Sequence, residues 1–88
     1  MTLQEIIADI HGINAELARF EKKYGLLSDV FYEWYCSGEE PEDDSWMLDF
    51  ALWAGLYEAK LERERMFRAA VAQKKSPLRI MQGALAPT

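Results

Sequence analysis

The chain has 88 residues, of which 50% are hydrophobic and 12% aromatic, and its formal net charge is −5. This length fits one small domain, which buries only about 60–65% of its unfolded surface and gains stability from a partner. The apolar content excludes a chain that is disordered throughout. No apolar run approaches the roughly 20 residues that cross a bilayer, and no secretory leader is evident. We therefore expect a cytoplasmic protein without a membrane partner.

A capping box predicts the start of a first long helix, because Thr2 is followed by Glu5 three residues later. The helix runs to Tyr24 and ends at Gly25, a residue type that adopts the left-handed conformation without strain. Gly12 in its interior predicts close approach by another helix. Apolar residues form a stripe with alternating spacings of three and four residues, as in coiled coils: Leu3, Ile6, Ile10, Ile13, Leu17, Phe20 and Tyr24.

A short second helix is predicted from Asp29 to Ser37, with Ser28 as its N-cap and Gly38 as its C-terminal stop. Its large side chains are aromatic: Phe31, Trp34 and Tyr35. They could line a ligand site, but we prefer the interpretation that they close the end of a helical hairpin. The acidic loop that follows, residues 39–44, flanks a third helix whose N-cap is Asp43, Asp44 or Ser45.

The third helix is predicted from about Ser45 to about Gln73, and its first half supplies the core. Four aromatic residues share one face at helical spacing: Trp46, Phe50, Trp53 and Tyr57. The same spacing continues through Lys60, Glu64, Phe67 and Val71, so the stripe becomes charged. If the long helices are antiparallel, the first covers the third only from about Trp46 to Phe67.

The predicted fold is therefore all-α. It is an antiparallel hairpin of two long helices, with the short aromatic helix at the connecting end and a basic C-terminal extension. We divide the chain into a hairpin domain, residues 1–66, and an extension, residues 67–88.

Residues suited to catalysis or metal binding are few. Cys36 is the single cysteine and His11 the single histidine, and neither has a neighbour at ligand spacing. The acidic loop lacks the alternating ligands and central glycine of a calcium site. We expect a solvent-facing His11, no metal, no cofactor and no enzymatic activity.

Two stretches resemble a group of small helical prokaryotic proteins. The first is Phe20-Glu21-Lys22-Lys23-Tyr24-Gly25, and the second, beyond Phe31-Tyr32 and the acidic loop, is Trp53-Ala54-Gly55-Leu56-Tyr57-Glu58. These proteins look like antitoxins encoded beside TumE-type toxins. The resemblance covers about residues 3–65; the loop at Glu39-Glu40-Pro41 departs from it, and the tail after Met66 lies outside it. It implies a non-enzymatic protein that binds and neutralises a cognate toxin.

Charge is distributed unevenly along the chain. Residues 1–59 hold 13 acidic and 3 basic residues, a net charge of −10, whereas residues 60–88 hold 7 basic and 2 acidic residues, a net charge of +5. A basic tail can bind nucleic acid, but this one has no Arg-Gly repeat and no interleaved aromatic residues. We therefore do not expect the chain alone to bind nucleic acid.

The expected partner-binding segment is the overhang of the third helix and the tail behind it. It outruns the first helix, and its apolar residues have no expected neighbour within the chain, so they would anchor a partner while the basic residues steer the encounter. The predicted site comprises Phe67, Arg68, Val71, Lys74, Lys75, Leu78, Arg79, Ile80 and Met81. The alternatives are a tail that only solubilises the hairpin, a homodimeric coiled-coil scaffold that pairs through the first helix, and a small nucleic-acid-binding regulator.

Overall fold

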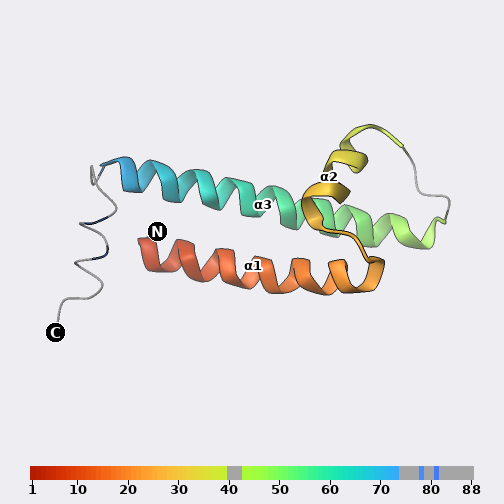
Figure 1. The fold of residues 1–88 in the computed structure, drawn as a ribbon, viewed down its shortest axis with the longest axis horizontal. Helices are drawn as coiled ribbons and strands as arrows, with labels where there is room; N and C mark the ends of the chain where they lie inside the picture. The colour runs from red at the N-terminus through yellow and green to blue at the C-terminus, as the bar shows by residue number, and fades with distance from the viewer. Residues whose placement is uncertain (40–42, 74–77, 79–80, 82–88) are drawn as a thin grey trace.

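The structure, a computed structural model, describes residues 1–39, 43–73, 78 and 81. The helices that it defines in this part of the chain are α1 (Leu3–Tyr24), α2 (Ser28–Cys36) and α3 (Ser45–Gln73) (Figure 1). No strand occurs among these residues. The predicted all-α class is confirmed.

Local sequence determines both ends of α1. The Thr2 backbone N–H donates to Glu5 Oε1 at 3.0 Å, and the Glu5 N–H donates to Thr2 Oγ1 at 3.1 Å, which completes the capping box. Gly25 ends the helix at φ 68°, and its N–H donates to the Glu21 carbonyl. The expectation for Gly12 is wrong within the single chain, because a Cβ at that position would meet no atom within 4 Å.

The start of α2 differs from the expectation, because its N-cap is Leu27 and not Ser28. Ser28 is buried, and both its N–H and its Oγ donate to Glu21 Oε2, at 2.9 and 2.7 Å. The carboxylate of α1 therefore satisfies the first amide of α2, so the serine hydroxyl does not serve as a cap and is buried instead. Gly38, at φ 89°, lies just beyond the end of α2 as predicted.

Asp43, one of the three expected caps, lies two residues before the start of α3 and bonds its first residue. Its carboxylate oxygen Oδ1 accepts hydrogen bonds from both the N–H and the Oγ of Ser45, at 2.9 and 2.7 Å. These bonds hold the pKa of Asp43 below its usual value of 3.8. The helix then continues without a break to Gln73, through the division expected between residues 66 and 67.

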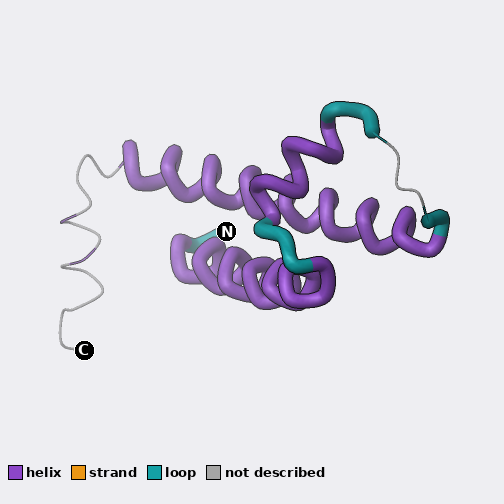
Figure 2. The backbone as a smooth tube through the Cα atoms, turned by 45° about the vertical axis from the view of Figure 1, so that its right-hand side comes forward, coloured by secondary structure: helices purple, strands orange, loops and turns teal. Residues whose placement is uncertain are grey.

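The two long helices run side by side in opposite directions (Figure 2). Asp9 pairs with Arg63 at 3.1 Å near one end, and Lys23 pairs with Asp49 at 2.6 Å near the other. In this register Leu3 lies opposite about Ala69, so α1 extends about two residues further along α3 than expected. The longer helix α3 projects past α1 at both ends (Figure 1).

The core lies where α2 crosses the hairpin. Trp53 is fully buried, and Phe31 of α2 stacks on it with ring centroids 3.8 Å apart. Trp53 Nε1 donates to Ser28 Oγ at 2.9 Å, so the indole is satisfied although no water reaches it. Trp46 is 42% exposed despite its place in the aromatic stripe, because it precedes the part of α3 that α1 covers.

Candidate protein-binding surfaces

The stretches of residues 20–25 and 53–58 meet in the core. Phe20 stacks on Trp53 with centroids 5.7 Å apart, and Tyr24 stacks on the same indole at the same distance. A chain of hydrogen bonds runs from Trp53 through Ser28 to Glu21. These residues therefore hold the three helices together, and the exposed surfaces lie elsewhere.

One exposed feature is an apolar hollow near the N-terminus of α1. It has a volume of about 210 Å³ and is lined by Ile7, Ile10, His11 and Phe67. Phe67 is half-buried here, so the expectation that it has no neighbour within the chain is wrong. The reason is the register, which carries α1 past Phe67. His11 is exposed, as predicted.

The other residues of the predicted partner site are distributed over α3 and the tail. Arg68 is exposed and Val71 half-buried, both within α3. Leu78 and Met81 are helical and exposed by 56% and 51%. The remaining four residues lie outside the described part of the chain: Lys74, Lys75, Arg79 and Ile80.

Exposed apolar residues also gather at the connecting end, which the sequence interpretation did not single out. Among the described residues, seven of the twelve exposed large hydrophobic side chains fall in two short segments: Leu26, Leu27, Val30, Trp46, Met47, Leu48 and Leu52. The pair Leu48 and Leu52, one turn apart and off the aromatic stripe, was a detectable indication. It marks a second apolar face on α3, opposite the buried one.

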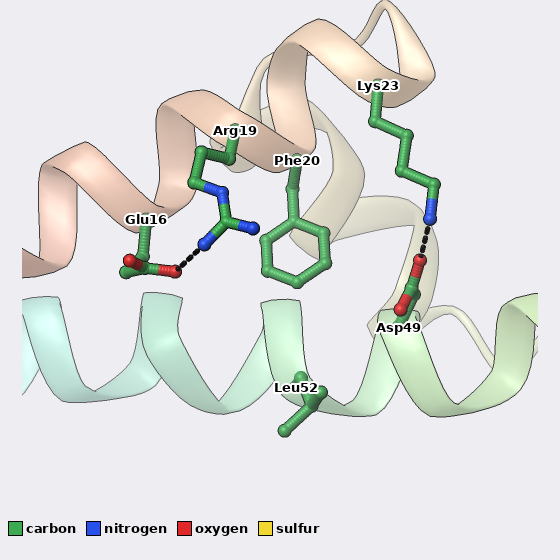
Figure 3. Close-up of a pocket in the computed structure, with 6 residues that line it drawn as sticks. All are labelled: Glu16, Arg19, Phe20, Lys23, Asp49 and Leu52. Atoms are coloured by element: carbon green, nitrogen blue, oxygen red, sulfur yellow. Dashed lines mark hydrogen bonds and ion pairs between the residues drawn. The ribbon is translucent and has the colours of Figure 1, made fainter.

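A second hollow, of about 350 Å³, lies between α1 and α3 (Figure 3). Phe20 and Leu52 form its apolar part. Ion pairs flank them: Glu16 with Arg19 at 3.0 Å, and Lys23 with Asp49 at 2.6 Å. The complete lining is Glu16, Arg19, Phe20, Lys23, Asp49 and Leu52.

Asp49 is the electrostatic centre of this hollow. Its Oδ2 accepts from Lys23 Nζ at 2.6 Å and from the Tyr24 hydroxyl at 2.5 Å. The Lys23 bond, followed by the Tyr24 bond, lowers the pKa of Asp49 below 3.8, and the same carboxylate raises the pKa of Lys23. Both charges persist at neutral pH, so the hollow presents fixed charges of both signs.

The polar groups near Cys36 act as a structural link. The Tyr32 hydroxyl donates to Glu58 Oε1 at 2.9 Å and thereby joins α2 to α3. Hydrogen bonding to Cys36, and then to Glu58, raises the pKa of Tyr32, which keeps the phenol protonated. Cys36 itself is exposed.

Within the described residues, no three His, Cys, Asp or Glu side chains come together as metal ligands. In the same part of the chain, no helix combines the length and apolarity that a membrane span requires. The prominent surface features are apolar and charged, and such features suit the binding of another protein.

Comparison of the chain with protein-family models, with curated proteins and with solved structures found no match.

Proposed function

We propose that this chain is a non-enzymatic antitoxin-like protein that binds and neutralises the toxin of a prokaryotic toxin-antitoxin pair. The proposal rests on the resemblance of its two stretches to TumE-associated antitoxins. One structural observation supports it: Phe20 and Tyr24 of the first stretch pack on Trp53 of the second. The shared pattern therefore has a physical meaning, because its residues jointly build this three-helix unit.

We place toxin binding at the end of the hairpin where the N-terminus of α1 meets the last turns of α3. The hollow formed by Ile7, Ile10 and Phe67 offers apolar surface, and Arg68 adds an exposed positive charge beside it. The part of the extension that follows Gln73 supplies further apolar and basic residues. A toxin with an acid-rimmed apolar groove matches this combination, with apolar residues as anchors and basic residues guiding association.

A truncation tests this location. Removing residues 74–88 leaves all three helices and the Phe67 contact intact, whereas a cut at residue 66 would remove part of the hairpin. The shortened chain should retain its helical circular dichroism and should bind the neighbouring gene product at least about tenfold more weakly. Undiminished affinity would show that residues 74–88 are not part of the site.

A charge reversal gives a finer test of the same location. Arg68→Glu should slow association with the toxin, and the loss should diminish as salt is raised. Lys22→Glu is the matched control, since Lys22 is also exposed but lies in the last turn of α1, at the opposite end of the hairpin. The functional readout is the ability of each variant to restore growth of cells that express the toxin. Equal effects of the two reversals would contradict the proposed location.

A further inference from the structure

The face of the hairpin that carries the Phe20–Leu52 hollow has no covering element in the described chain. In Figure 3 it is seen with α2 behind the two long helices. Leu52 is 53% exposed on this face, and Leu48, one turn earlier, is 70% exposed. An apolar face of this kind on a small domain is typical of an interface.

Two glycines on the same face have no explanation within the chain. Gly12 precedes Glu16 by one turn, and Gly55 follows Leu52 by one turn, so each continues the row of residues at the hollow. Both lie inside helices, where glycine is less stable than alanine. A Cβ at either position would meet nothing within 4 Å. The absence of side chains leaves a shallow surface that another helix could approach closely.

The charges of this face select the kind of partner. Residues 1–59 carry 13 acidic and only 3 basic residues, so most contacts between this part of two copies of the chain would be repulsive. Two of those three basic residues, Arg19 and Lys23, line this hollow beside two carboxylates. Their side chains are 77% and 63% exposed and remain available to an opposing surface. The hollow thus carries two charges of each sign, which can pair with the opposite charges of a second copy across a two-fold axis.

The area of the face is also sufficient for a stable interface between two copies. The 22 residues of α1 span about 33 Å, and two adjacent helices are about 20 Å wide, so the projected face measures roughly 650 Å². A standard interface buries about 800 Å² of accessible surface on each partner, and accessible area exceeds projected area.

From these observations we infer that two copies of the chain pair through this face, with α1 and α3 of each copy forming a four-helix bundle. The interface is isologous, with Leu52 toward the connecting end of the face and Arg19 and Lys23 facing carboxylates of the other copy. This dimer touches the apolar stripe of α1 only at its edge, at Phe20, because α3 covers the rest of the stripe within the chain. It also leaves the end at Phe67 open for the proposed toxin.

Analytical ultracentrifugation of the full-length chain tests the inference without a toxin. Over about 1 µM to 1 mM, a range that covers weak and moderate dissociation constants, the mass should rise to that of two chains. Leu52→Glu should keep the chain monomeric throughout. Val30→Glu is the matched control, because Val30 is 47% exposed on α2, outside this face, and this variant should dimerise normally.

The glycines give a test in which two readouts move in opposite directions. Gly55→Ala should raise the Tm of the monomeric Leu52→Glu variant, because alanine is the better helix former. In the background that retains Leu52, the same change should weaken dimerisation at least about tenfold, because the added methyl separates the helices. Gly12→Ala should behave likewise.

Several results would overturn the dimer: a wild-type chain that remains monomeric over the full range, a dimer that survives Leu52→Glu, or one that Val30→Glu disrupts. If the chain is monomeric and Leu52→Glu weakens toxin binding, the face belongs to the toxin and the dimer is wrong. Loss of toxin binding alone does not affect the inference, since the centrifugation contains no toxin.

Discussion

Phe31 lies flat against Trp53, with ring centroids 3.8 Å apart and ring planes 3° apart. The two side chains are 1% and 0% exposed, and they come from α2 and α3. The Trp53 indole also stacks on Phe20 and Tyr24 of α1. One side chain therefore joins all three helices, and its removal should affect the whole fold.

Trp53→Ala should lower the free energy of unfolding by about 3–5 kcal/mol, because it empties the centre of the core. Small domains are stable by only about 5–15 kcal/mol, so much of the stability would be lost. Urea unfolding followed by circular dichroism at 222 nm measures the change. Leu52→Ala at low protein concentration is the control and should change stability by at most about 0.5 kcal/mol.

Ser28→Ala should cost about 1–3 kcal/mol although it removes a single oxygen atom. It leaves the buried Trp53 Nε1–H without an acceptor and removes one of the two Ser28 donors to Glu21. Thermal unfolding measures the loss as a lower Tm. Ser37→Ala provides the comparison, since the exposed Ser37 hydroxyl bonds the Trp34 carbonyl at a helix end. Equal effects of the two substitutions would contradict a structural role for the buried hydrogen-bond chain.

Asp49→Asn should change the pH dependence of stability on the acid side. The pKa of Asp49 is lower in the folded chain than its usual 3.8, so the unfolded chain binds more protons near pH 4. The stability that this carboxylate contributes is therefore present above that pH and is lost as pH falls through the folded pKa. We expect the wild-type Tm to fall more steeply than the Tm of the variant below about pH 4. Parallel curves would show that the Lys23 and Tyr24 bonds contribute no pH-dependent stability.

Phe67→Ala should lower the free energy of unfolding by roughly 1–2 kcal/mol, since the side chain is half-buried beside Ile7 and Ile10. Arg68→Ala, at the adjacent exposed position, should have little effect. Guanidinium unfolding of both variants distinguishes the observed register from a shorter pairing that would leave Phe67 in solvent. A neutral Phe67→Ala would favour the shorter pairing.

The elements that sequence predicted well depend on neighbours along the chain. The Thr2–Glu5 capping box, the Gly25 stop and the Asp43 cap each form within a few residues. The predicted start of α2 was wrong because the Ser28 amide bonds Glu21, a side chain of another helix whose position follows only from the tertiary structure. Helical spacing could not reveal that contact.

The register between the long helices was likewise not predictable, because it depends on contacts that only the tertiary structure defines. Apolar spacing shows which faces meet, but sliding one helix along the other by about two residues still brings those faces together, and Phe67 appeared uncovered for this reason. The bonds of Lys23 and Tyr24 to Asp49 mark the observed alignment. For the candidate surfaces, the sequence indicated the charge asymmetry. Leu48 and Leu52 also mark a second apolar face of α3, but helical spacing does not show whether such a face is covered by another element.

The packing around Trp53 also provides an intrinsic optical reporter. Because rings from α1 and α2 hold this indole rigidly, it should dominate the near-ultraviolet circular dichroism, whereas the 42% exposed Trp46 should emit like an indole in water. Loss of either α1 or α2 from the assembly would release the same ring. A near-ultraviolet band that disappears together with the helical signal would identify folding as one cooperative step, and a band that disappears first would reveal a detached helix.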